Sequence, residues 1–423
     1  MSIVRNRQWR SSATALILPF ALISAAYGQP PPVGEVRLRP LIEEALKQNA
    51  EVVAARVRVE AARARIPQAL ALPDPRASIS PETTTRFGRL VETEFNVSQT
   101  FPYPGKLQLQ GVVAEHEAEQ VREELRAKER EIAARVKLAF HELFRSHKFI
   151  DVKRAEVEIL TTFARMAETR YEVGKAAQSD ALKAQVELAK ALTSLVTLEQ
   201  ERETAQAALN AVLGRTPRDP LGVPAPRDFT PFTLRIDEVG RLALDQRPEL
   251  AAAERAIQKA RAGVDLAKRQ YFPDVSVGAT YKIESPGPNH WEVGVSINIP
   301  WLYTKSRYDA RVREAAAQAA NALATQDGLR IQTLFGVKDL FEKVRASERL
   351  VVLYKTSILP QASQALEAAI ASYQTGQTDF LTLLESQRTL REIERVYFAS
   401  WTEFEQRQAE LERVVGADLG SLK

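Results

Sequence analysis

The sequence predicts a mainly α-helical fold that carries a few membrane-type β-strands and is built from two copies of one plan. Two very long stretches are rich in Ala, Glu, Arg, Lys and Leu and almost free of helix breakers. Short runs elsewhere alternate between apolar and polar residues, which is the period of a strand with two different faces. An internal duplication relates the two halves, so we expect the same order of elements twice.

The duplication is visible in two segments. Residues 44–51 (EALKQNAE) recur as residues 242–249 (LALDQRPE), an offset of 198. Nine further residues recur at a constant offset of 202: Tyr171, Gly174, Leu182, Gln185, Leu188, Glu201, Gln206, Leu209 and Gly214 match Tyr373, Gly376, Leu384, Gln387, Leu390, Glu403, Gln408, Leu411 and Gly416. Chance identity between Ala- and Leu-rich helices would not hold one register over this length.

The chain divides into five predicted segments. Residues 1–28 have the form of a cleaved secretory signal, with a basic start at Arg5, Arg7 and Arg10, an apolar stretch too short to span a membrane, and a small-x-small site. Residues 29–214 and 237–416 form the two repeats. Residues 215–236 form a proline-rich linker, and residues 417–423 a C-terminal tail.

Within each repeat the apolar period changes. Residues 38–70 and 237–270 have apolar residues three and four apart, which predicts an amphipathic helix. Residues 275–283 and 293–299 alternate and predict two strands, each long enough to cross a bilayer when tilted. In the first half, residues 95–102 match residues 293–300, whereas the partner strand near residues 76–80 is weaker and is interrupted by Pro81.

The long helices are predicted over residues 106–171 and 307–373, which contain almost no breaker except Gly328, Gly336 and Pro360. At 1.5 Å per residue each would reach roughly 100 Å. Such a helix without a wide apolar face is stable only when it packs against neighbours along its length, as in a coiled coil.

Four short strands cannot close a barrel, and open strand edges in lipid leave backbone groups unpaired. No other apolar run reaches the length of a spanning helix, so any crossing of a membrane must use these strands. We therefore expect a homotrimer that contacts membrane lipid, with a 12-stranded barrel above a tube of long helices.

Composition excludes several classes. Removing the three arginines of the signal lowers the net charge from +4 to +1, so the sequence favours no nucleic-acid partner. Without cysteine the chain has no disulfide, no thiolate metal site and no lipid anchor after the signal.

No enzyme is expected. His141 and His147 resemble a zinc-protease motif, but six residues separate them, which places them about 120° apart around a helix. No phosphate-binding loop, nucleophile elbow or carboxylate pair stands out, so we expect no catalytic residue, no cofactor and no metal site.

The order of signal, helix, strand pair, long helix, tight turn and long helix, given twice, resembles the TolC family of outer membrane efflux proteins. The resemblance covers essentially the whole mature chain. It implies long coiled-coil helices forming a periplasmic α-barrel, four transmembrane strands per protomer, and a passive exit duct in the outer membrane. The family's most recognisable segment is the turn between the long helices, here residues 171–180 (YEVGKAAQSD) and 373–382 (YQTGQTDFLT).

From the residues alone, Gly174 and Gly376 should each end a helix, and Ser179 or Thr378 should begin the next. The resemblance implies that a periplasmic adaptor docks on these turns, through Val173, Gly174, Ser179, Asp180, Thr375, Gly376 and Thr382. It also implies a gate and an acidic constriction at the entrance, formed by Tyr373, Asp180, Asp379 and Glu385. The resemblance implies an acid six residues after the second turn glycine, but this sequence has Thr382 at that position.

Residues 98–107 (SQTFPYPGKL) resemble the heavy-metal resistance branch, whose partners are a periplasmic adaptor and an inner-membrane resistance-nodulation-division pump. The identity of the exported solute stays open, because metal ions, drugs and other small compounds are all compatible with a polar tube. The alternative is a secreted or periplasmic coiled-coil scaffold or adhesin without channel activity.

Overall fold

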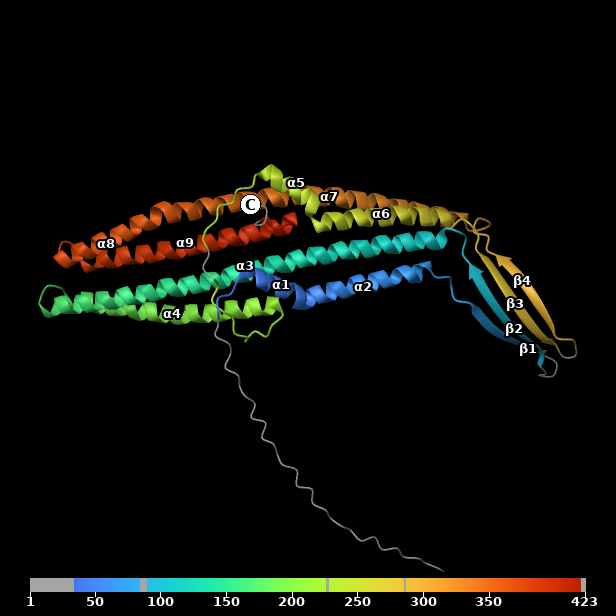
Figure 1. Ribbon diagram of the computed structural model, residues 1–423, viewed down its shortest axis with the longest axis horizontal. Helices are drawn as coiled ribbons and strands as arrows, with labels where there is room; N and C mark the ends of the chain where they lie inside the picture. Colours follow the sequence, from blue (N-terminus) through green and yellow to red (C-terminus); the bar gives the residue numbers. More distant parts are fainter. Residues whose placement is uncertain (1–33, 84–89, 226–227, 285–286, 420–423) are drawn as a thin grey trace, which may run out of the picture.

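The computed structural model describes residues 34–83, 90–225, 228–284 and 287–419. It shows an elongated layer of long helices with a four-stranded sheet at one end (Figure 1). The predicted signal at residues 1–28 lies outside the described residues.

The first repeat consists of α1 (Leu38–Gln48), α2 (Ala50–Leu70), β1 (Arg76–Thr83), β2 (Leu90–Phe101), α3 (Lys106–Glu172) and α4 (Gln178–Leu213). The second consists of α5 (Ile236–Gln246), α6 (Pro248–Arg269), β3 (Val275–Glu284), β4 (His290–Ile297), α7 (Lys305–Leu353), a π-helical turn η1 (Tyr354–Ile358), α8 (Leu359–Thr375) and α9 (Phe380–Val415). The predicted fold of long helices with four strands is thus confirmed for the protomer.

Each helix predicted over residues 38–70 and 237–270 is in fact two helices. The first breaks at Asn49, whose extended backbone and side-chain oxygen cap α2 through the N–H of Glu51 at 2.9 Å. The second breaks at Arg247, because the residue before a proline, here Pro248, is disfavoured in the helical conformation. The apolar period continues through both breaks, so the prediction of one continuous helix was wrong.

The duplicated glycines Gly214 and Gly416 close each repeat onto these breaks. Both end a helix with left-handed φ angles, 82° and 79°. A Cβ on Gly214 would lie 3.1 Å from the carbonyl oxygen of Gln48, and one on Gly416 would lie 2.7 Å from that of Gln246. The repeated glycine therefore permits a close backbone approach as well as a turn.

α3 runs unbroken for 67 residues, about 100 Å at 1.5 Å per residue. Its counterpart, predicted as one helix over residues 307–373, is interrupted by η1, where the N–H of Leu359 donates to the carbonyl of Tyr354. The next residue, Pro360, has no N–H and cannot continue the ordinary helical ladder. The predicted continuous helix is corrected at this point, although α7 passes through both of its glycines.

The sheet is antiparallel in the order β1-β2-β3-β4. On one face Ala279 lies between Val97 and Val293, and Tyr281 pairs with Trp291. β4 starts three residues earlier than predicted and ends two residues sooner. The weak first strand forms through Pro81, which pairs with Thr93 of β2.

The opposite face is polar. Asn96 donates to Thr280 at 2.7 Å, and Thr100 contacts Ser276 at 2.9 Å. Farther along the strands, Lys282 forms ion pairs with carboxylates on both neighbouring strands. The sheet thus has one apolar and one polar face, as its alternation predicts.

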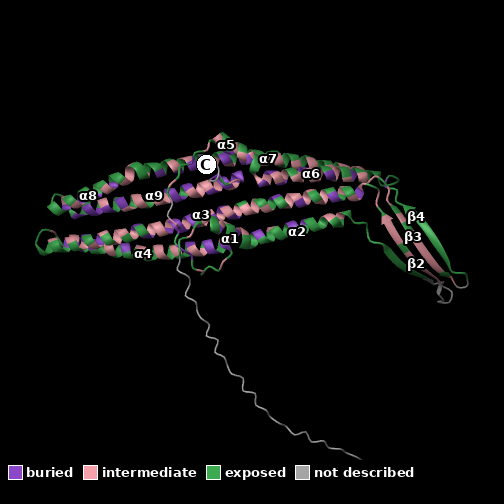
Figure 2. Ribbon diagram, in the orientation of Figure 1, coloured by how far each residue is buried: buried purple, intermediate pink, exposed green. Residues whose placement is uncertain are grey.

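Buried apolar residues form three clusters along the helices. Near the middle, one cluster lies within the first repeat around Phe140 and Leu209, and another, around Phe341 and Phe404 of the second repeat, also includes Phe144 of α3. The third cluster, which we call the tip core, joins α3, α4, α8 and α9 near their turns. Figure 2 shows the buried residues as narrow stripes along helices whose other faces are exposed or half-buried.

None of the helices in the described part of the chain is both long enough and apolar enough to cross a membrane.

Candidate functional site

The two helical turns at the end remote from the sheet have the same geometry (Figure 1). After α3, Gly174 has φ 69° and the N–H of Lys175 donates to the carbonyl of Arg170 at 2.8 Å. After α8, Gly376 has φ 79° and the N–H of Gln377 donates to the carbonyl of Ser372 at 2.8 Å. Both glycines therefore end a helix as predicted, because left-handed backbone is easy only for glycine.

The predicted caps of the following helices are wrong. Ser179 lies inside α4, whose N-cap is Ala177, and its hydroxyl lies 3.4 Å from the carboxylate of Asp180. α9 is capped by Asp379 rather than Thr378, since the Asp379 carboxylate accepts the N–H of Thr382 at 3.0 Å. The hydrogen bond from the Thr382 hydroxyl, followed by the one from its backbone N–H, lowers the pKa of Asp379.

Tyr373 is the most enclosed of the predicted entrance residues. The residue is 3 % exposed, and its ring packs 5.6 Å, centroid to centroid, from Phe380 within the tip core. Burial raises the pKa of its phenol, and the negative charge of Asp180 adds to the rise while Arg170 opposes it. The hydroxyl has no hydrogen-bond partner within the described residues.

Arg170, at the end of α3, contacts Tyr373 in two ways. Its guanidinium carbon lies 4.6 Å from the centre of the ring, and its Nη1 donates to the backbone carbonyl of Tyr373. Because α3 and α8 belong to different repeats, this contact joins the two hairpins. The structure thus brings Tyr373 together with Arg170 of the first repeat, and within the described residues Tyr373 forms no hydrogen bond with Asp180.

The remaining predicted docking and constriction residues are on the surface of the tip. Val173, Gly174, Ser179, Thr375, Gly376, Asp379, Thr382 and Glu385 are exposed, and Asp180 is half-buried. A second polar contact between the repeats lies farther from the turns, where Arg388 of α9 pairs with Glu187 of α4 at 2.7 Å.

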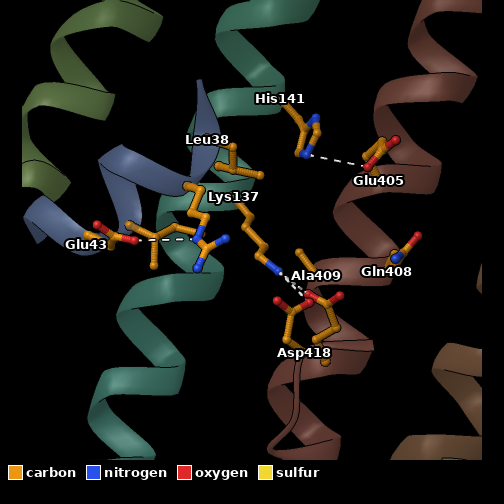
Figure 3. A pocket seen from close by; sticks show the side chains of 11 residues that line it. Leu38, Glu43, Lys137, His141, Glu405, Gln408, Ala409 and Asp418 are labelled. Carbon is orange, nitrogen blue, oxygen red and sulfur yellow. Dashed lines mark hydrogen bonds and ion pairs between the residues drawn. The ribbon is translucent and has the colours of Figure 1, made fainter. Parts of the chain in front are cut away.

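A groove of about 610 Å³ follows the seam between α3 and α9, bounded by α1 (Figure 3). In it, Lys137 of the first repeat pairs with Glu412 of the second and lies 3.7 Å from Asp418. Burial raises the pKa of Glu412, although the charge of Lys137 opposes the rise. The groove therefore carries a buried ionic contact between the repeats.

The two histidines of the protease-like segment occupy different surroundings. His141 points toward Glu405 across the groove at 3.7 Å (Figure 3). Burial, followed by the charge of Arg202, lowers the pKa of His147. Within the described residues, no group of three or more His, Cys, Asp or Glu side chains is placed to hold a metal ion.

Comparison with known families decides the assignment. The family described as outer membrane efflux protein matches residues 41–215 and again residues 239–417. The chain belongs to this family. The resemblance that the turns and the duplicated order of elements carry is thereby confirmed.

Individual members of the outer membrane efflux protein family are distant in sequence. The cobalt-zinc-cadmium resistance protein CzcC of Cupriavidus metallidurans is 24 % identical over 389 residues, 90 % of each chain. The solved structure of CusC superimposes with a TM-score of 0.78 at 18 % identity, covering 91 % of this chain and 93 % of CusC. VceC of Vibrio cholerae gives 0.75 at 21 % identity, covering 90 % and 96 %. At these identities the structural likeness shows the shared fold alone.

Sequence reasoning did not identify Arg170, the Glu187–Arg388 pair or the groove. One signal was available for Arg170, since the residue at the duplicated position is Ser372. A charged residue present in one copy only, beside an otherwise repeated turn, marks a place where the two hairpins differ. The contacts in the groove carried no such signal, because acids and bases recur throughout these helices.

Proposed function

We propose that three copies of this chain close into one outer membrane duct, the exit component of a tripartite efflux system. The observation that carries the proposal is the sheet, in which β1 and β4 each pair on one side only within the described residues. Unpaired edges in lipid cost several kcal/mol per group, and three four-stranded sheets joined edge to edge would remove them as a 12-stranded barrel.

Apolar residues along the helix layer support the same assembly. α2 and α4 lie along one edge of the layer and α7 and α8 along the other (Figure 1). Large apolar side chains are exposed on both sides: Val53, Val57, Leu182, Val186, Leu192 and Val196 on the first, and Ile331, Leu334, Phe335 and Leu350 on α7. Packing the first edge of one copy against the second edge of the next closes a ring of identical contacts.

The faces of the sheet give the barrel its orientation. Val293 and Val295 on the apolar face are 77 % and 69 % exposed in the protomer, as expected of residues that face lipid. The opposite face then lines the duct. There Lys282 lies 2.8 Å from Glu94 and 3.4 Å from Glu292, with Glu92 at 3.5 Å. The acids outnumber the lysine, which favours passage of cations.

The tip turns are the proposed contact with a periplasmic adaptor, through Val173, Gly174, Ser179, Asp180, Thr375, Gly376 and Thr382. They are exposed at the end of the helices opposite the sheet, where an adaptor and an inner-membrane resistance-nodulation-division pump would lie (Figure 1). Tyr373, Asp180, Asp379 and Glu385 form the proposed gate and constriction. The pump supplies the energy, and this chain conducts.

We propose heavy-metal cations as the exported solutes. CzcC, whose name describes cobalt, zinc and cadmium resistance, matches over 90 % of both chains. Deleting this protein from its host should lower the tolerated concentration of these cations. Unchanged tolerance of all three, with lost tolerance of an organic compound, would reassign the solute without affecting the duct.

Oligomeric mass and location test the duct. The protein should fractionate with the outer membrane after loss of its signal, and the detergent-extracted species should have about three times the protomer mass. A monomer of at most 47.2 kDa in the soluble periplasmic fraction would contradict the proposal.

A further inference from the structure

We propose that Arg170 is a latch that holds the two hairpins of one protomer together and thereby sets how readily the channel entrance opens. The inference rests on the proposed function, because an entrance at the tip exists only if the chain forms a duct. It assigns the role to a residue outside the predicted gate set, and it gives Tyr373 a different part from the one expected.

The contacts of Arg170 join two hairpins that are far apart in the sequence. α3 and α4 form the first hairpin, and α8 and α9 form the second. The guanidinium covers the ring of Tyr373 at 4.6 Å and donates to its carbonyl oxygen. A flat cation stacked on an aromatic face and bonded to the same residue's backbone has little freedom to slide, so separating the hairpins breaks both interactions.

The acceptor is well suited to a cation. Tyr373 lies in the last turn of α8, where the helix dipole is negative. Its carbonyl accepts the N–H of Gly376 at 3.1 Å and retains a second lone pair for the arginine. Gly376 leaves space for the arginine, since a Cβ there would lie 3.3 Å from Nη2 of Arg170. The glycine therefore ends the helix and also admits the latch.

The aromatic ring, rather than the hydroxyl, makes the contact. Tyr373 is buried and its hydroxyl has no partner within the described residues, whereas ring and carbonyl are both engaged. The duplicated tyrosine, Tyr171, is 45 % exposed, and the residue before Tyr373 is Ser372 where the first repeat has Arg170. The second hairpin thus cannot form the same latch with a neighbouring copy, and the contact exists once per protomer.

A second contact acts in the same direction. Arg388 of α9 pairs with Glu187 of α4 at 2.7 Å, again between the hairpins. With 52 % of its side chain exposed, Arg388 is screened by water, whereas Arg170 covers a buried ring. We therefore place the main latch at Arg170.

Single-channel recording of the purified full-length trimer in planar bilayers tests the inference. Arg170→Met keeps the length of the side chain but removes the charge and its donors, and should raise the open-to-closed ratio about fivefold. Arg165→Met is the matched control, because Arg165 is exposed on the same helix, and it should behave as wild type.

The thermal midpoint of each trimer separates a latch from a general packing role. Arg170→Met should alter gating with little change in that midpoint, and Arg170→Lys, which loses the flat stack, should give an intermediate ratio of about twofold. If Arg170→Met forms no trimer, Arg170→Lys alone decides.

Wild-type gating in the Arg170 variants would overturn the latch. Absence of any conductance in the wild type would instead overturn the proposed duct.

Discussion

At the residue scale, the two hairpins are joined near their tips by contacts between unlike side chains from the two copies of a duplicated plan. Tyr373 and Gly376 have counterparts in the first repeat, but Arg170 has none in the second. Duplication therefore supplies the shared turn, and departures from it supply the contacts that hold one hairpin against the other.

The ion pair between Glu187 and Arg388, which also joins the hairpins, should depend on pH. Burial raises the pKa of its carboxyl, but hydrogen bonds from Arg388 and Lys190 lower the pKa overall. A lowered carboxyl pKa contributes stability that is present above the usual value of 4.5 and is lost as pH falls through the lowered value. Because Arg388 is half exposed, we expect no more than about 1 kcal/mol per protomer.

Glu187→Gln should accordingly lower the thermal midpoint at neutral pH, and its difference from wild type should shrink as pH falls below 4.5. Differential scanning calorimetry at several pH values measures this difference. Glu201→Gln, at an exposed site on the same helix, is the control and should show no such trend. A Glu187→Gln deficit that is constant with pH would contradict the ionic contact.

At the scale of the elements, the tip turns are the parts most open to a partner. Val173 is 62 % exposed in the turn after α3. A buried interface there would reject a new charge, so Val173→Glu should weaken adaptor binding about tenfold. Surface plasmon resonance with the purified adaptor measures the affinity.

Val223→Glu is the matched control for that measurement, because Val223 is 52 % exposed in the linker, where its carbonyl accepts the N–H of Val36 rather than facing the tip. It should leave adaptor affinity unchanged. Undiminished binding by Val173→Glu would remove this turn from the docking surface.

Sequence patterns predicted the elements better than their ends. Period and alternation were sufficient for α3 and β3, because no competing signal interrupts either one. They failed at Asn49 and Pro248, where a cap and a proline break the helix although the apolar spacing continues. They failed again before Pro360, where the structure inserts a π-helical turn that has no distinct apolar period.

The candidate site was predictable in part for a similar physical reason. The turn glycines follow from local backbone chemistry, so Gly174 and Gly376 could be placed in advance. Contacts between helices far apart in sequence, such as Arg170 with Tyr373 and Lys137 with Glu412, depend on how the repeats pack. No local pattern encodes that packing.

At the scale of the whole molecule, one protomer has the features of a single segment of a larger ring. Within the described residues its sheet ends in unpaired edges at β1 and β4, its helix layer exposes apolar residues on both sides, and its cores are narrow stripes (Figure 2). Two repeats per chain and three chains per ring would give an assembly of six similar hairpins around one axis. In that assembly the strand edges would be paired and the exposed apolar residues of the helix layer would be buried between protomers.

Ion conductance of the purified protein in planar bilayers tests this account most directly. A trimeric duct should give discrete conductance steps. Its small currents should be biased toward cations, because the polar face of the strands carries more acids than bases. A protein that inserts into no bilayer and stays monomeric would contradict it, and would favour a coiled-coil scaffold in the periplasm instead.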